Sequence, residues 1–215
     1  VLFGFSIVQI TGEPEPNLSP NHFDAIRGCK QYENVTGYDD RPNYFLTEEL
    51  RRTYHTHNTK IFKFGIMGAH AGVIRFGDSA YPYGHYVTEI VISGSRNVMS
   101  VAHRQFRSNS NVPRNELLVE AVTPNLLSKF KPTMFTLELH QAGNVILRKF
   151  DDSTVLLEFR DESVAHSVKY MGFVNMAADM IYFYDCPQNS DPVGRIVEPS
   201  EERDTVLLRC SIQEQ

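Results

Sequence analysis

The segment between residues 78 and 86 contains the side chains best suited to bind a ligand. Its sequence, DSAYPYGHY, places three tyrosines and a histidine within nine residues. Aromatic faces with polar tips suit sugars and small amphipathic molecules, because the rings cover apolar surfaces while hydroxyl and imidazole groups form hydrogen bonds. We expect the turn around Arg96 to lie beside this loop. The alternative is that the tyrosines only pack the loop against its own strands. The candidate ligand-binding residues are Tyr81, Tyr83, His85, Arg96 and Asn97.

Other reactive side chains form weaker patterns. His55 and His57 would lie on one face of a strand, where they could bind a metal ion together with a third ligand. The sequence identifies no such ligand, so two exposed histidines are the simpler interpretation. No serine lies in a GxSxG motif, and adjacent acids such as Asp151 and Asp152 point to opposite faces of a strand. We therefore predict no metal site, no catalytic residue and no bound cofactor.

The composition is typical of a globular protein with a packed core. Hydrophobic residues make up 41% and charged residues 22% of the 215 residues, which is ordinary for such proteins. The formal net charge is -5 and the Lys and Arg residues form no run, which argues against a nucleic-acid partner. No segment approaches the roughly 18 consecutive apolar residues that a membrane-spanning helix needs.

The N-terminal residues predict secretion. Residues 1–12 are apolar, and the sequence EPEP follows them directly. This abrupt change is typical of the end of a signal-peptide hydrophobic region, with Gly12 as the small residue before a cleavage point. A buried first strand is the alternative interpretation. Asn34 and Asn17 begin two N-glycosylation sequons, of which the second is the poorer acceptor because Pro20 follows it.

The three cysteines are consistent with secretion. Cys29, Cys186 and Cys210 have neither the paired spacing of a zinc site nor that of a CxxC redox motif. In a secreted protein we expect a disulfide between Cys29 and Cys186, which would connect the N-terminal segment to the end of the domain. Cys210 would then pair with a cysteine outside this sequence or in another chain. The alternative is a cytosolic protein in which all three thiols are reduced.

A succession of short β-branched and aromatic segments predicts an all-β fold. The segments follow one another between Lys60 and Tyr184, separated by turns rich in Gly, Pro, Asn and Asp. Phe135, Leu137 and Leu139 alternate with polar residues, as in a strand with one buried face. We expect an antiparallel β-sandwich of about ten strands, of the jelly-roll or lectin-like type.

The same pattern divides the sequence into four parts. The stretch before residue 54 is rich in Pro, Asn, Asp and Gly and has little periodicity, so we expect an irregular extension there. After Pro192 a polar linker precedes one more strand-like segment, which would begin a further module. The expected parts are residues 1–12 (signal-peptide remnant), 13–53 (irregular extension), 54–187 (β-sandwich domain) and 188–215 (linker and start of a further module).

The region from Lys60 to Cys186 resembles the farnesoic acid O-methyltransferase-type domain of arthropod and other animal proteins. The turn and strand pattern of four stretches carries the resemblance, together with the ending YFYDC. These stretches are FGIMGAHAGVIRF (64–76), VTEIVISGSRNVMS (87–100), FTLELHQAGNVI (135–146) and YMGF (170–173). Relatives place tryptophan at some positions where this chain, which has none, carries Ser95, Phe135 and Met176. The family name implies methylation of farnesoic acid by S-adenosylmethionine.

The residues themselves give little support for methyl transfer. Most S-adenosylmethionine enzymes hold the cofactor in a parallel α/β sheet, at a Gly-rich turn between a strand and a helix. The nearest candidate is GIMGAHAG (65–72), but Gly72 leads directly into another strand-like segment. We therefore interpret this stretch as a β-turn whose glycines permit positive φ.

The sequence as a whole predicts a secreted, disulfide-linked β-sandwich that recognises a glycan or a small amphipathic molecule without turning it over. The first alternative is an O-methyltransferase that converts farnesoic acid to methyl farnesoate, and only this alternative requires S-adenosylmethionine as a cofactor. The second alternative is a structural module that joins the domains of a larger extracellular protein.

Overall fold

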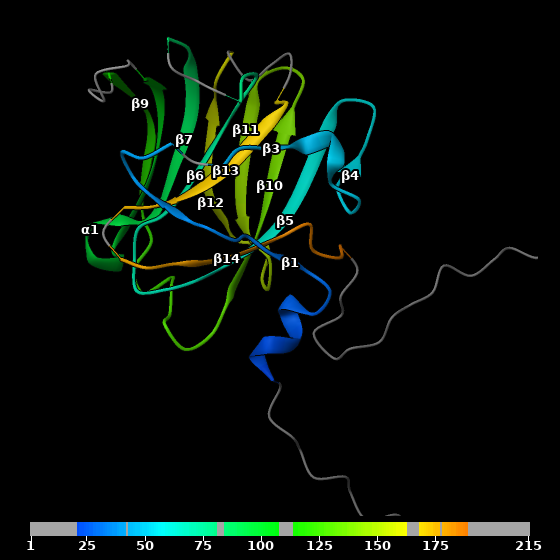
Figure 1. Ribbon diagram of the computed structural model, residues 1–215, viewed down its shortest axis with the longest axis vertical. Helices are drawn as coiled ribbons and strands as arrows, with labels where there is room; N and C mark the ends of the chain where they lie inside the picture. The colour runs from blue at the N-terminus through cyan, green and yellow to red at the C-terminus, as the bar shows by residue number, and fades with distance from the viewer. Residues whose placement is uncertain are drawn as a thin grey trace, which may run out of the picture.

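Two β-sheets packed face to face form the body of the protein (Figure 1). The computed structural model describes residues 21–41, 43–80, 84–107, 114–162, 168–176 and 178–188. Within these residues each sheet has seven strands, and all strand pairs but one are antiparallel. The predicted antiparallel β-sandwich is therefore confirmed. No helix among these residues has the length and apolar character needed to cross a membrane.

The ten segments predicted as strands correspond to β5 through β14. In spatial order, sheet A contains β1 (Lys30–Gln31), β14 (Ile181–Tyr184), β5 (Thr59–Met67), β10 (Thr133–His140), β11 (Asn144–Lys149) and β12 (Val155–Arg160), with β4 (Tyr54–His55) paired to β5. Sheet B contains β2 (Thr36–Gly37), β13 (Tyr170–Asn175), β6 (Gly72–Gly77), β7 (Tyr86–Ser93), β8 (Met99–Phe106) and β9 (Arg114–Val122), with β3 (Phe45–Leu46) paired to β13. The short helical turns are η1 (His22–Ile26), η2 (Thr47–Glu49) and α1 (Gly94–Asn97).

Alternating side chains from both sheets fill the space between them. Phe135, Leu137 and Leu139 of β10 are buried in this core, as their spacing predicts. From sheet B, Phe173 of β13 enters the same core and stacks on Tyr182 of β14 with a ring-centroid distance of 4.7 Å. Because successive residues of a strand point to opposite faces, the residues between these positions form the outer faces of the sandwich.

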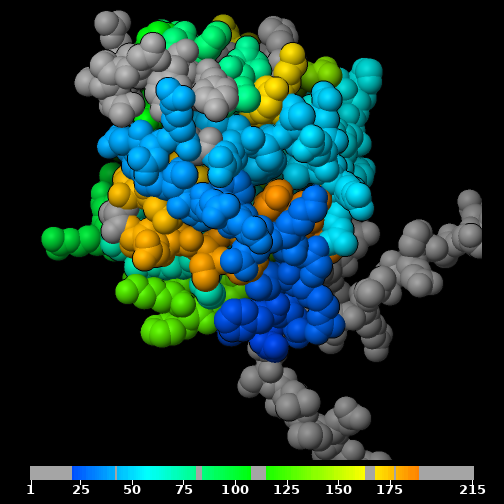
Figure 2. Space-filling model, in the orientation of Figure 1, coloured from blue at the N-terminus to red at the C-terminus, as the bar shows by residue number. Residues whose placement is uncertain are grey.

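The N-terminal segment is more ordered than its composition suggested. From residue 21 onward it contributes β1 to sheet A and β2 and β3 to sheet B. Of these, the sequence suggested only a short strand near Phe45, which is β3. Cys29 forms a disulfide with Cys186, which is the pairing expected from the sequence. In Figure 2 the N-terminal residues, in blue, spread over the molecule beside the yellow and orange strands β13 and β14. The segment is thus an integral part of the sandwich.

Candidate functional site

An open pocket of about 360 Å3 lies at the end of sheet B where β6 leads into β7. We call this end the pocket end. Aromatic and polar side chains line the pocket together, which is the arrangement expected for a small-ligand site. Its lining residues are Phe76, Gly77, Asp78, Gly84, His85, Tyr86, Thr88 and Phe106. They come from β6, β7, β8 and the connection between β6 and β7.

Main-chain hydrogen bonds and a ring contact hold the mouth of this pocket in place. The Gly84 amide donates to the Arg107 carbonyl oxygen at 2.7 Å, and the Arg107 amide donates to the His85 carbonyl oxygen at 3.4 Å. Tyr86 and Phe106 are paired across β7 and β8, and their ring centroids are 5.1 Å apart. Tyr86 nevertheless keeps 54% of its surface exposed. Its ring is therefore positioned by a neighbour and still available to stack on a ligand.

At the inner part of the pocket, the polar side chain of Thr88 is held by a hydrogen bond to a neighbouring carboxylate. Thr88 donates its hydroxyl proton to Asp161 at 2.8 Å, and Arg104 donates to the other carboxylate oxygen of Asp161 at 2.7 and 3.0 Å. The hydrogen bond to Asp161 raises the pKa of Arg104, so this side chain stays positively charged. These groups are already engaged with one another, whereas Asp78 and His85 are exposed at the mouth. The polar contacts to a ligand would therefore come from Asp78 and His85.

The structure separates the predicted ligand-binding residues. His85 lines the pocket, while Tyr81 and Tyr83 fall outside the described residues. Arg96 and Asn97 belong to α1, which follows β7, whereas His85 precedes β7. Eight residues of extended strand span roughly 25 Å, so the two groups lie at opposite ends of the sandwich. The expectation that the Arg96 turn lies beside the aromatic loop is wrong, because the turns before and after one strand lie at opposite edges of its sheet.

The side chain of Asn97 holds two backbone segments together. Its side-chain amide donates to the Leu127 carbonyl oxygen at 2.9 Å, and its side-chain oxygen accepts from the Leu127 amide at 3.0 Å. Ser95, Arg96 and Asn97 all have positive φ, at 49°, 61° and 67°, so α1 is a left-handed turn. Left-handed conformations are costly for residues other than glycine. The two bonds from Asn97 help to hold that turn, and Arg96 is exposed beside it.

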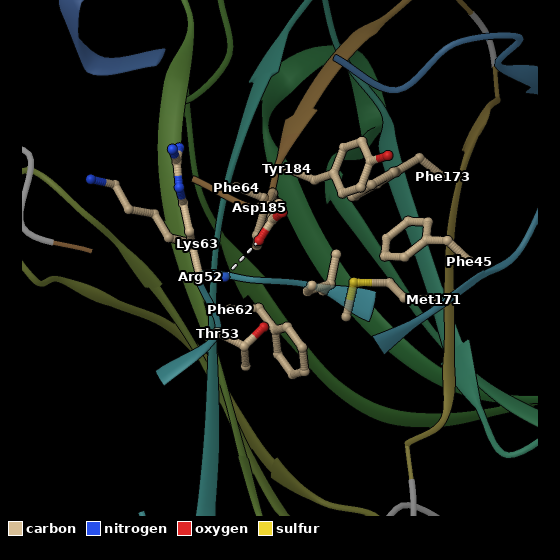
Figure 3. Close-up of a pocket in the computed structure, with 11 residues that line it drawn as sticks. Phe45, Arg52, Thr53, Phe62, Lys63, Phe64, Met171, Phe173, Tyr184 and Asp185 are labelled. Carbon is tan, nitrogen blue, oxygen red and sulfur yellow. Dashed lines mark hydrogen bonds between the residues drawn. The ribbon is translucent and has the colours of Figure 1, made fainter. Parts of the chain in front are cut away.

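A second cavity lies between the sheets, but it is only about 10 Å3 in volume (Figure 3). Phe45, Phe62 and Met171 surround it, while the side chains of Arg52 and Lys63 point away from it. A cavity of this size holds about one water molecule. This interior space is therefore too small for a cofactor or a ligand.

Lys63, which borders this cavity, has a strongly shifted pKa. It lies on the outer face of sheet A, is 3% exposed, and its ammonium group is 3.5 Å from the centre of the Phe150 ring. Burial lowers the pKa of Lys63 to about 8, although the nearby Asp151 carboxylate opposes this shift. The cost of burying the charge thus outweighs the attraction to that acid.

The glycines of the 65–72 stretch are required for close packing. A side chain at Gly65 would overlap Met134, one at Gly68 would overlap Met180, and one at Gly72 would crowd Ile66. Positive φ occurs at Ala71 rather than at these glycines, so the prediction that they permit positive φ is wrong. The stretch connects β5 of sheet A to β6 of sheet B. It leads into a strand and not into a helix, as the sequence indicated.

A buried polar cluster on the outer face of sheet B was not identified from the sequence. Arg75 and Glu89 form an ion pair at 2.6 Å, and Tyr38 donates its hydroxyl proton to Glu89 at 2.7 Å. Gln105 donates to the Tyr38 hydroxyl at 3.0 Å, and Arg107 donates to Gln105 at 2.6 Å. Burial, followed by the charge of Glu89, raises the pKa of Tyr38. Tyr38 therefore keeps its proton, and the mutual hydrogen bonds of the cluster suit a structural role. Its sequence signal is a charged residue in the middle of each of two apolar strands.

Of the residues predicted to be glycosylated or to pair outside the chain, the structure describes only Asn34. Asn34 is exposed in the turn between β1 and β2. Asn17 and Cys210 fall outside the described residues. No group of three His, Cys, Asp or Glu residues in the described part of the chain is arranged to hold a metal ion.

Comparisons with known proteins identify a family. The sequence profile of farnesoic acid O-methyl transferase matches residues 38–188. No curated protein sequence matches this chain.

Solved structures share only weak similarity with the chain. A chain of botulinum neurotoxin type C, whose entrance into cells depends on interaction with two ganglioside molecules, is 11% identical, with a TM-score of 0.32 over 60% of this chain. The match covers 31% of that neurotoxin chain. A CBM2 module of the evolved Dit protein of Lactobacillus casei BL23 phage J-1 is 9% identical, with a TM-score of 0.33 over 73% of this chain and 88% of that one. Similarities at this level do not bear on function.

Proposed function

The chain belongs to the farnesoic acid O-methyltransferase family, and we propose that within this family it acts as a non-catalytic recognition module. Its ligand is a carbohydrate or a small amphipathic molecule, bound in the pocket formed by β6, β7 and β8. The observation that carries this proposal is the mouth of the pocket, where the exposed Tyr86 ring lies with a carboxylate and an imidazole.

The chemistry of the mouth fits a sugar well. An aromatic ring can cover the apolar face of a pyranose, while Asp78 and His85 can form hydrogen bonds with hydroxyl groups at its edge. The volume of about 360 Å3 is in the usual range for small-ligand sites, which starts at roughly 300 Å3. The strands on either side make the site largely preformed, so little ordering is needed on binding.

Glycan and lipid arrays probed with the full chain would test this proposal. For any ligand found, we expect Tyr86→Ala and His85→Ala each to weaken binding about tenfold, because they remove the ring and the imidazole that would contact the ligand at the mouth of the pocket. Tyr54→Ala is the matched control, since Tyr54 is 55% exposed and lies outside the pocket. Equal binding by the Tyr86 variant and the wild type would exclude this pocket as the site.

Methyl transfer is the second candidate, and the family match is the observation that favours it. Such a reaction needs a site that aligns the sulfonium of S-adenosylmethionine with the acceptor carboxylate. Isothermal titration with S-adenosylmethionine and S-adenosylhomocysteine separates the two candidates. Micromolar binding of either compound would contradict a purely recognising role and would direct attention to an acceptor site. No heat from the folded protein at high cofactor concentration would favour recognition.

We further propose that the protein is secreted and carries a glycan on Asn34. The Cys29–Cys186 disulfide supports this proposal, because such bonds persist in oxidising compartments. The exposed Asn34 side chain is accessible to a glycosylating enzyme. Expression in a secreting animal cell should give a product in the medium whose mass falls on glycosidase treatment. In Asn34→Gln that mass change should be absent.

A further inference from the structure

Exposed apolar side chains gather at the end of the sandwich opposite the pocket. Phe130 is 85% exposed, which makes it the most exposed large apolar residue in the described part of the chain. Val122 is 75% exposed and Val98 is 46% exposed at the same end. We call these three residues, together with Arg96, Lys129 and Lys131, the tip. Large apolar side chains left in water at a shared location indicate an interaction surface.

The cations of the tip are free of ion pairs with described residues. Lys129 and Lys131 flank Phe130 and are exposed, as is Arg96 in α1. By contrast, Lys149 in the neighbouring turn pairs with Asp151 and Asp152. The tip segments GSRNV (94–98) and TPNLLSKFKP (123–132) contain no acidic residue, although the chain has a net charge of -5. The two tip segments therefore carry three exposed cations and no acid of their own, while the acids Asp151 and Asp152 of the neighbouring turn pair with Lys149.

Hydrogen bonds join the two tip segments into one unit. Besides the two bonds between Asn97 and Leu127, the Thr123 amide donates to the Val98 carbonyl oxygen at 2.7 Å. The Asn125 amide donates to the Asn97 carbonyl oxygen at 2.8 Å. In Figure 1 α1 and the light-green segment before β10 occupy this end of the sandwich. The exposed side chains thus project from a fixed base, and little conformational freedom is lost when the tip binds.

We propose that the tip docks on the surface of an anionic lipid bilayer. Phe130, Val98 and Val122 would enter the boundary between headgroups and acyl chains, where apolar and aromatic side chains are favoured. Lys129, Lys131 and Arg96 would lie at the level of the lipid phosphates and attract anionic headgroups. A bilayer offers an apolar layer and a plane of negative charge together, which is the complement of this tip. The site lies at the opposite end from the pocket, so the two proposals stand independently.

Co-sedimentation of the full chain with vesicles tests this proposal. Vesicles of phosphatidylcholine with about 30% phosphatidylserine should retain the protein, and pure phosphatidylcholine should retain much less. Phe130→Ser should reduce the partition coefficient about tenfold, since it removes the ring that would be buried in the bilayer. The double variant Lys129→Glu/Lys131→Glu should reduce it at least twentyfold, and about 0.5 M salt should weaken wild-type binding.

Matched variants outside the tip serve as controls. Tyr54→Ser removes an aromatic ring that is 55% exposed, and Arg51→Glu/Lys169→Glu reverses two exposed cations. Both should bind the anionic vesicles as the wild type does. Absence of wild-type binding, equal binding to neutral vesicles, or equal losses in tip and control variants would each overturn the proposal. Retention on heparin without vesicle binding would also overturn it and would assign the tip to an anionic glycan.

Discussion

Arg75 and Glu89 on the outer face of sheet B form an ion pair at 2.6 Å with both side chains at most 1% exposed. On the outer face of sheet A, Arg148 and Glu138 form a pair of similar length, 2.7 Å, but these side chains are 30% and 19% exposed. Both pairs lie across neighbouring strands of a sheet. The difference is the N-terminal segment, whose Tyr38 lies over the first pair and contacts both of its members.

This difference shows how strongly a covering segment changes the contribution of an Arg–Glu ion pair to stability. In water an ion pair adds little, because solvent screens the charges and both side chains lose freedom. Under Tyr38 each charge has lost its water, so the partner becomes necessary. The buried ion pair of sheet B therefore depends on Tyr38 of the N-terminal segment, while the Arg148–Glu138 pair of sheet A stays open to solvent. Four experiments can break or sharpen this comparison.

Arg75→Met should have the largest effect. It leaves the Glu89 carboxylate buried without its cation, and we expect the free energy of unfolding to fall by about 3–5 kcal/mol. The double variant Arg75→Met/Glu89→Leu should lose much less, because no charge is left unpaired. Urea unfolding of both variants measures the difference. A single variant no less stable than the double one would contradict the role given to burial.

Removing the disulfide should have the next largest effect. The Cys29–Cys186 bond closes a loop of 157 residues, and Cys29→Ser/Cys186→Ser should lower the free energy of unfolding by about 2–4 kcal/mol. The wild type under reducing conditions should show a similar loss. Limited proteolysis should also cut the variant first in the N-terminal segment. Earlier cleavage within the long strands would contradict the inference that this segment depends on the disulfide for its position.

Lys63→Met tests a buried cation on the outer face of sheet A. Folded Lys63 loses its proton at a pKa of about 8, while the unfolded chain keeps it up to 10.5, so the unfolded state binds more protons between these values. The destabilisation caused by burying the charged Lys63 side chain is therefore complete below pH 8 and disappears as the pH rises to 10.5. We expect the variant to be more stable than the wild type by about 1–2 kcal/mol at pH 7, with this advantage fading at higher pH. Chemical unfolding at several pH values measures it, and a constant difference would contradict burial as the cause.

Arg148→Ala should have the smallest effect, about 0.5 kcal/mol. Glu138 keeps access to water and loses little when its partner is removed. The same unfolding measurement as for Arg75 makes the two faces directly comparable. A loss as large as that of Arg75→Met would show that cover by the N-terminal segment does not distinguish the two pairs.

Periodicity was sufficient to predict the ten strands β5 through β14 and the buried face of β10. Alternation at Phe135, Leu137 and Leu139 has one physical explanation, which is a strand with one buried face. The strands β1 and β2 have only two residues each, so no period can appear in them. They form because the disulfide and the neighbouring strands hold the segment against the sheets.

The candidate site was predictable only in part. The local sequence identified His85 from its type and its aromatic neighbours, but Phe76 and Phe106 enter the pocket because β6, β7 and β8 are paired. Such pairing is not visible in a single stretch of sequence. The position of Arg96 was mistaken for the same reason, since proximity in the chain does not show which end of a strand a turn occupies.

The disulfide also determines how the domain would respond to mechanical force. Cys29 and Cys186 hold their Cα atoms 4.1 Å apart and enclose both sheets in one covalent loop. Tension applied to the chain on either side of this pair would pass through the sulfur–sulfur bond and not through the strands. A protein stretched in this way would extend only by the residues outside the loop, and its core would stay folded until the bond is reduced.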